Sequence, residues 1–194
     1  MLREPEKLNL SGYRFLKMSE EIILGGDMLL EKEEEESQKM GSVNHSLAQS
    51  QLTALISHDK RFRTLVELSL DASQIDLSQF GLKAKDELIP DICIYHKENA
   101  SRPMEKGRDL MKMSQMPSLV IEILSPKQTI NEIITKFDAF FALGVKSCWL
   151  VVPVTESITV YSAPNDFITF GTEATEIIDT RMDIHLSREN IFEW

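Results

Sequence analysis

Apolar residues recur along two stretches of the chain at the spacing of an α-helix. Between Ser46 and His58 they occupy every third or fourth position, which predicts a helix with one buried face. Six more, from Ile130 to Phe141, repeat with the same period. Gly144 follows them in a position that favours glycine, so the second helix is predicted to end there.

Strand patterns occupy much of the remaining sequence. The most apolar run, residues 118–124, is hydrophobic on both faces except for one carboxylate, which is typical of a central strand covered on both sides. Residues 89–95 predict a second strand that opens with a proline, and residues 65–70 alternate as a third. Further strands are expected at 22–24, 28–30, 149–152, 158–161 and 167–170.

The order of these elements indicates the fold class. A strand, a polar connection at 96–117, a central strand, a helix and another central strand together contain a βαβ unit. We therefore expect an α/β protein with a mixed β-sheet flanked by helices. The length of 194 residues suits a single domain, 1–194, in which about 1–18 and 31–41 are loose because polar residues dominate there.

Composition indicates the expected compartment. Hydrophobic residues make up 42% of the chain and charged residues 27%, as in ordinary globular proteins. No apolar run approaches the ~18 residues of a membrane span, and the N-terminus lacks the apolar core of a signal peptide. Cys93 and Cys148 lie in apolar runs and share no metal-ligand spacing. We expect a cytoplasmic protein with reduced thiols and no membrane partner.

The distribution of charge restricts where a polyanion could bind. A net charge of −10 argues against a protein that depends on bulk attraction to phosphate. Residues 59–139 carry 12 basic and 13 acidic residues, so a binding face is expected in that nearly neutral part. Within the 96–117 connection, Lys106, Arg108 and Lys112 are candidates for DNA contact, although acidic neighbours leave the connection a surplus of only two positive charges.

Glu122 is the anomaly of the sequence because it lies inside the most apolar strand. A lone charged carboxylate buried there costs several kcal/mol, so it must be neutral, paired or bound to a metal. Asp91 stands near the start of the 89–95 strand, and the two carboxylates meet at one end of the sheet if the strands are neighbours. Two hard oxygen ligands with open positions for water suit Mg²⁺ or Mn²⁺.

Lys136 is the candidate third member of this site. Helical periodicity places it at the edge of the apolar stripe, where its stem can lie along the sheet with its ammonium over the carboxylates. There it could orient a water molecule and stabilise charge on a phosphate. The alternative is an exposed ion pair with Glu132, one turn earlier, worth a few tenths of a kcal/mol. The residues alone leave both interpretations open.

The run PSLVIEILSP at 117–126, followed by Lys136, FFALGVKSCWLVVP and ITVY, resembles the Uma-type restriction endonuclease family of the PD-(D/E)XK nuclease superfamily. The resemblance covers nearly the whole chain. It implies a restriction-endonuclease-like fold and a catalytic site of Asp91, Glu122 and Lys136. Asp91 and Glu122 would bind Mg²⁺ or Mn²⁺, together with the backbone carbonyl of Ile123, and Lys136 would position a water molecule.

The same resemblance implies two supporting residues. Glu132 stands where the family commonly has an aspartate, and it would hold Lys136 in place or share a second metal site. His45, which opens the first predicted helix, matches a frequent histidine of the family. A histidine on an apolar helix face is also the pattern of a core residue whose hydrogen bonds are satisfied, and this alternative stays open.

The sequence departs from the superfamily's usual motif at one place and from the family pattern at two. Leu124 occupies the position of the superfamily's usual lysine, which this family moves to the following helix, as Lys136 matches. Val152 replaces an aspartate before Pro153. The glycine turn at 25–27 differs as well, so no N-terminal acidic site residue is assigned.

The resulting hypothesis is a Mg²⁺-dependent endonuclease that hydrolyses phosphodiester bonds of DNA and forms a homodimer, as many nucleases of the superfamily do. A non-catalytic binding or regulatory module with the same fold is the alternative. The net charge of −10 and the lack of a separate DNA-reading motif favour that alternative. The presence of Asp91, Glu122 and Lys136 together favours the nuclease, because an unused buried carboxylate only destabilises a fold.

Overall fold

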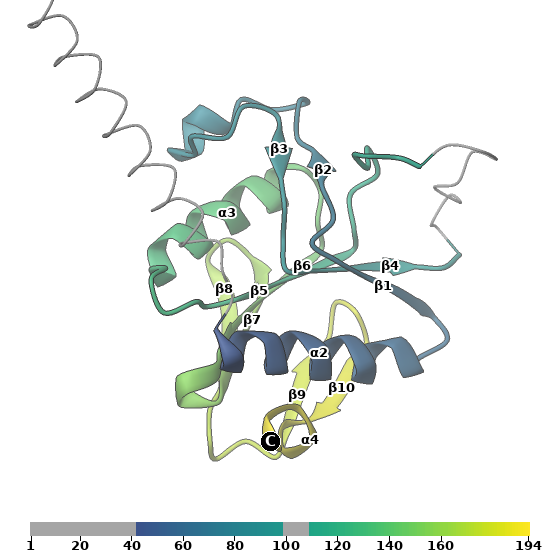
Figure 1. Ribbon diagram of the computed structural model, residues 1–194, viewed down its shortest axis with the longest axis vertical. Helices are drawn as coiled ribbons and strands as arrows, with labels where there is room; N and C mark the ends of the chain where they lie inside the picture. The colour runs from purple at the N-terminus through teal and green to yellow at the C-terminus, as the bar shows by residue number, and fades with distance from the viewer. Residues whose placement is uncertain (1–41, 99–108) are drawn as a thin grey trace, which may run out of the picture. The chain divides into compact units, whose positions relative to one another are not determined.

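The computed structural model describes residues 42–98 and 109–194, which form a mixed sheet with helices on both faces (Figure 1). The strand order is β1-β4-β5-β6-β7-β8. Only β5 and β6 are parallel neighbours, and the other neighbouring pairs are antiparallel. The six strands are β1 (Phe62–Val66), β4 (Ile92–His96), β5 (Leu119–Ile123), β6 (Ser147–Val152), β7 (Ser157–Ala163) and β8 (Asp166–Phe170).

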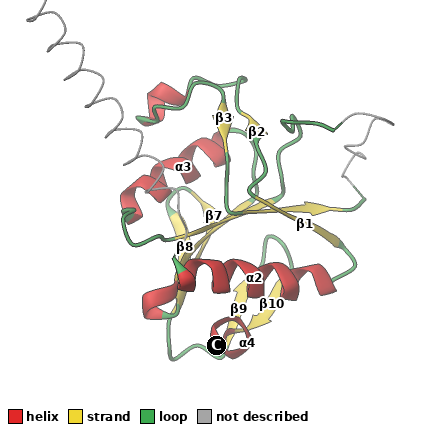
Figure 2. Ribbon diagram, viewed as in Figure 1, coloured by secondary structure: helices red, strands yellow, loops and turns green. Residues whose placement is uncertain are grey.

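Two layers of smaller elements cover the sheet (Figure 2). One layer is built on helix α2 and the other on helix α3. The layer of α2 (Val43–His58) also contains β9 (Glu176–Asp179), β10 (Ile184–Ser187) and α4 (Arg188–Phe192). The layer of α3 (Ile130–Ala142) also contains β2 (Leu70–Asp71), β3 (Glu87–Leu88) and the 3₁₀ turn η1 (Leu77–Phe80), whereas the second 3₁₀ turn, η2 (Pro153–Thr155), connects β6 to β7.

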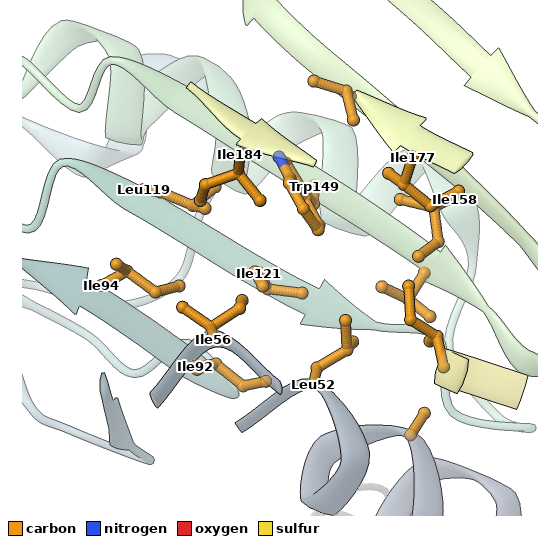
Figure 3. Packing of buried hydrophobic residues seen from close by; sticks show 14 of the residues in the cluster. Leu52, Ile56, Ile92, Ile94, Leu119, Ile121, Trp149, Ile158, Ile177 and Ile184 are labelled. Carbon is orange, nitrogen blue, oxygen red and sulfur yellow. The ribbon is translucent and has the colours of Figure 1, made fainter. Parts of the chain in front are cut away.

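The sheet separates two hydrophobic cores, and β5 contributes to both. Its residues Leu119, Ile121 and Ile123 pack with α2 in the core shown in Figure 3. Val120 points the other way, into the core under α3. This alternation is the ordinary consequence of a two-residue strand period. Glu122 shares the face of Val120, so the chain places a carboxylate in the α3 layer.

Helix α3 is delimited by local signals. The Thr129 hydroxyl accepts a hydrogen bond from the Glu132 backbone N–H, and the Glu132 carboxylate accepts one from the Thr129 backbone N–H, which is a capping box. The chain leaves the helix through Gly144, whose φ of 93° is a left-handed conformation that favours glycine. The parallel pair β5 and β6 and this helix form the predicted βαβ unit.

Most predicted elements are present, and one strand was placed wrongly. Instead of one strand over 65–70, β1 begins at Phe62 and ends at Val66, and β2 begins at Leu70. Glu67 interrupts the pattern with a φ of 49°, which no strand accommodates. The elements β9, β10 and α4 were not predicted. The strands expected at 22–24 and 28–30 and the expected loose segments lie outside the described residues.

A buried aspartate joins the C-terminal hairpin to the sheet. Asp179 is 0% exposed, and its Oδ2 accepts hydrogen bonds from the Ser147 hydroxyl at 2.6 Å and the Trp149 indole N–H at 2.8 Å. Its Oδ1 accepts the backbone N–H groups of Arg181 and Met182 at 2.9 and 3.1 Å. Four donors thus satisfy this carboxylate without a cation, which indicates a structural role.

Both cysteines lie inside the folded part of the chain. Cys93 and Cys148 are both free and buried, and burial raises the pKa of each thiol above its ordinary value. Their thiols are therefore protonated and unreactive in the folded protein. Among residues 42–98 and 109–194, no helix has both the length and the apolar character to span a membrane.

Candidate active site

The pairing of β4 with β5 brings Asp91 and Glu122 to the same end of the sheet. Ile92 pairs with Ile121 in antiparallel register, so the next positions outward, Asp91 and Glu122, stand opposite each other. The Asp91 side chain reaches across to β5, where its Oδ2 accepts the backbone N–H of Ile123 at 2.6 Å. The register therefore brings together the two carboxylates that the sequence indicated.

Helix α3 places Lys136 against Glu122. The ammonium Nζ lies 3.1 Å from Oε2 and 3.2 Å from Oε1 of Glu122, so it contacts both carboxylate oxygens. Glu122 is 2% exposed, whereas 27% of the Lys136 side chain remains accessible. The lysine thus enters the site from the solvent edge of the helix, with its stem along the α3 core.

Burial dominates the electrostatics of this pair. Burial is the largest cause that raises the pKa of Glu122 to about 7; the charge of Asp91 acts in the same direction, and Lys136 opposes both. Burial also lowers the pKa of the Lys136 ammonium, but the attraction of Glu122 outweighs this, and the net pKa lies above its ordinary value. The lysine is therefore charged, and Glu122 holds its negative charge only weakly near neutral pH.

Helix α2 contributes His45 from the opposite layer. The ring is 7% exposed, and its Nε2 lies 3.2 Å from Oδ2 of Asp91. The hydrogen bond to Asp91 is the main reason why the pKa of His45 lies above its ordinary value, although burial opposes it. Both interpretations of His45 therefore agree with the structure. The residue is buried like a core histidine, and its hydrogen-bond partner is a candidate site carboxylate.

The main chain of Asp91 has two partners that sequence patterns did not indicate. Its carbonyl oxygen accepts a hydrogen bond from Nε2 of Gln49 at 3.0 Å and another from the backbone N–H of Glu67 at 3.1 Å. Gln49 is one polar residue among several on α2, and its partner lies 42 positions away. No local signal in the sequence distinguishes it.

Glu132 makes different contacts from those expected. Its carboxylate accepts hydrogen bonds from the backbone N–H and the hydroxyl of Thr129 at 2.7 and 2.9 Å, and these bonds hold the pKa of the carboxyl below its ordinary value. Among the ion pairs of the described residues, Lys136 pairs with Glu122 and not with Glu132. The geometry thus assigns Glu132 to the helix cap.

The assignment of Glu132 to the helix cap predicts how two substitutions change the free energy of unfolding. Thr129→Ala is expected to lower the free energy of unfolding by about 1 kcal/mol, because one N-terminal helix donor loses its partner. Glu132→Gln keeps the capping-box geometry and should change stability by only a few tenths of a kcal/mol. Urea unfolding of both variants measures this, and a Glu132→Gln loss well above that of Thr129→Ala would contradict the cap assignment.

The three basic residues expected to contact DNA are only partly described. The Nζ atom of Lys112 lies 3.6 Å from Oδ1 of Asp86, the residue that precedes β3. Lys106 and Arg108 lie outside the described residues. Of the three, only Lys112 can be placed, and its ion-pair partner is Asp86, not a carboxylate of the candidate site.

One surface hollow lies away from the carboxylates. Its volume is about 430 Å³, and it is formed by the end of α2, the start of β1 and β10. His45 belongs to the first turn of α2, whereas this hollow begins at Leu55 near the other end of the helix. Its charged residue Arg61 is already bound by Asp59 and Asp183. We place the candidate site at the carboxylates because, within residues 42–98 and 109–194, the buried Glu122 is held by a single partly exposed lysine, whereas the buried Asp179 has four hydrogen-bond donors.

This fold, with a buried glutamate–lysine pair at the end of a mixed sheet, is of the restriction-endonuclease-like α/β class. A family model, Uma2, described as "Putative restriction endonuclease", matches residues 33–180, and the chain belongs to this family. The resemblance noted in the sequence is thereby confirmed.

One solved structure gives a detailed likeness. It is titled a "putative nuclease belonging to DUF820" from Anabaena variabilis ATCC 29413, and it shares 23% identity with this chain. The match covers 81% of this chain and 84% of that one, with a TM-score of 0.64. At this identity the likeness shows a common fold. A comparison with curated proteins yields no match.

Proposed function

We propose that this chain is a metal-dependent nuclease that hydrolyses phosphodiester bonds of DNA. The observation that carries the proposal is Glu122, a carboxylate 2% exposed whose oxygens both contact Lys136 and which stands opposite Asp91. Burial of this group costs free energy that an ion pair with one partly exposed lysine offsets only in part, which favours a role for Glu122 in a site. Membership in a restriction endonuclease family supports the reaction class.

The donor set fits a hard divalent cation that keeps most of its water ligands. Among the described residues, no group of three or more histidine, cysteine, aspartate or glutamate side chains could hold a metal. Asp91 and Glu122 supply two carboxylates, which is the number with which proteins often hold Mg²⁺ beside substrate phosphates. The contacts of the Asp91 carboxylate with His45 and the Ile123 N–H both use Oδ2, which leaves Oδ1 for a further ligand. When bound, the ion would activate a coordinated water and neutralise phosphate charge.

The protein groups around this position each have a definite task. Lys136 presents a partly exposed ammonium that can donate to a phosphate oxygen and stabilise the negative charge that develops there. His45 and the Ile123 N–H hold the Asp91 carboxylate at one oxygen. Glu122 has a pKa of about 7, so a nearby cation would favour its charged form. The site is thus organised to accept positive charge.

The proposal includes a homodimer, because many nucleases of this superfamily cut the two strands of a DNA duplex as dimers. The main observation against it is the net charge of −10, which opposes association with a polyanion. A non-catalytic module with this fold is the second candidate. Cleavage of DNA by the wild type, lost in site variants, distinguishes the two.

A thermal melt with Mg²⁺ or Mn²⁺ tests the metal first. At 100 times its dissociation constant, a specific ion should add about 2.7 kcal/mol to the free energy of unfolding and raise Tm by roughly 5–10 °C. Asp91→Ala should abolish this rise. Asp86→Ala, which removes an exposed carboxylate outside the site, is the matched control and should retain it.

The same proteins then go into a plasmid cleavage assay. Metal-dependent cleavage by the wild type and the Asp86→Ala control, but not by Asp91→Ala, is the expected result. A rise in Tm without cleavage would favour the metal-binding but non-catalytic module. Equal rises in the wild type and Asp91→Ala would place the ion elsewhere and overturn the proposed site.

A further inference from the structure

The Asp91 main chain is held more tightly than hydrogen-bond satisfaction requires. The backbone N–H of Glu67 already donates to the Asp91 carbonyl oxygen at 3.1 Å, so this acceptor has a partner without any side chain. Gln49 nevertheless donates a second hydrogen bond to the same oxygen at 3.0 Å. The second bond restrains the Asp91 carbonyl from another direction, because its donor belongs to helix α2, outside the sheet.

Gln49 and His45 act on Asp91 from the same face of α2. They are four residues apart, one helical turn, so their side chains lie one above the other. His45 contacts the carboxylate through Oδ2 at 3.2 Å, and Gln49 contacts the carbonyl at 3.0 Å. Two contacts on opposite sides of the Asp91 Cα restrict both the backbone and the side chain, which a single contact could not do.

The atom fixed in this way also bonds to the neighbouring strand. Oδ2 of Asp91 accepts the Ile123 N–H at 2.6 Å, and Ile123 directly follows Glu122. A rotation of the Asp91 main chain would therefore lengthen the Ile123 hydrogen bond and move Oδ1 relative to Glu122. The position of the candidate metal ligands thus depends on α2, which itself supplies no carboxylate to the site.

We propose that Gln49 is a positioning residue that fixes the direction of the Asp91 carboxylate through the hydrogen bond to its carbonyl. The effect on Asp91 geometry stands by itself, and the consequence for metal affinity rests on the proposed function. Loss of Gln49 leaves no buried backbone acceptor unpaired, since Glu67 remains, so the fold should persist while the geometry of the carboxylate changes.

Three variants test the proposal. Gln49→Ala removes the donor, and Gln49→Glu keeps the length but presents an ionised carboxylate that cannot donate to a carbonyl. Gln51→Ala, two residues along the same helix, is the matched control. The first readout is the amide proton of Ile123 in ¹H–¹⁵N spectra, because its chemical shift depends on the length of the bond to Asp91. The second is the dissociation constant for Mn²⁺.

We expect the Ile123 amide proton to move upfield in both Gln49 variants and to stay in place in Gln51→Ala. The Mn²⁺ dissociation constant should rise about tenfold in the Gln49 variants only, as for other residues that orient a metal ligand. An unchanged Ile123 amide in a folded Gln49→Ala and Gln49→Glu would overturn the proposal. If the amide moves but the wild type binds no Mn²⁺, the positioning role holds and the metal-dependent function fails.

Discussion

A Glu122→Gln variant should be more stable than the wild type at pH 8 and inactive in metal-dependent cleavage. Burial raises the pKa of Glu122 from 4.5 to about 7, so the folded protein at pH 8 contains a carboxylate that it holds unfavourably. This shift corresponds to about 3 kcal/mol. The attraction of Lys136 is already contained in this value, so a gain of about 3 kcal/mol is expected when glutamine replaces the ionised carboxylate.

The gain should depend on pH with a definite sign. Between pH 4.5 and about 7 the folded wild type retains a proton on Glu122 that the unfolded chain releases. The free energy of unfolding of the wild type therefore falls as pH rises through this range. Above pH 7 the loss caused by ionisation of Glu122 is complete and stays constant. Glutamine has no such titration. The difference in unfolding free energy between variant and wild type should be smallest near pH 4.5 and reach its maximum above pH 7.

Urea unfolding at pH 4.5, 6 and 8 measures this difference, and plasmid cleavage measures activity. Glu132→Gln is the matched control, since that carboxylate lies on the helix cap, and it should change neither property appreciably. A Glu122→Gln variant that loses stability at pH 8 would identify Glu122 as a structural partner of Lys136. Retained cleavage would remove Glu122 from the proposed mechanism.

The Asp179→Asn variant should have the opposite effect on stability, a loss of about 3 kcal/mol. Asparagine can still accept the two backbone N–H groups through its carbonyl oxygen. Its NH₂ group, however, would replace Oδ2 and face the donors of Ser147 and Trp149. At least one buried donor then lacks an acceptor, and such groups cost about 1–3 kcal/mol each.

Asp183→Asn is the matched control for this measurement. Asp183 lies in the same turn and its side chain is 79% exposed, and asparagine tolerates its φ of 52°. Its loss should stay within about 0.5 kcal/mol. Denaturant unfolding compares the two. An equal, small loss in both variants would show that the Asp179 hydrogen bonds contribute little to stability.

The central part of the fold could be predicted because its signals are local. The continuous apolar run of β5, the helical period of α3 and the glycine at 144 each decide structure within a few neighbouring residues. Glu122 was informative for the same reason, since a carboxylate in such a run is anomalous wherever the strand lies. The period of the helix made Lys136 a candidate partner, but the residues alone also allowed an exposed ion pair between Lys136 and Glu132.

The missed features depend on contacts between distant segments. Asp179 resembles any polar residue near a turn until Ser147 and Trp149, about 30 positions earlier, surround it. Gln49 gains its meaning from a carbonyl 42 residues away. The strand expected over 65–70 failed because Glu67 takes a left-handed conformation that its residue type does not favour.

The two hydrophobic cores determine at which stage of folding the candidate site is complete. His45 and Gln49 come from the α2 layer, Lys136 comes from the α3 layer, and the sheet carries the carboxylates between them. A partly folded chain with only one helix docked would present an incomplete site. Under the proposed function, chemistry at this position is therefore restricted to chains in which both cores have formed.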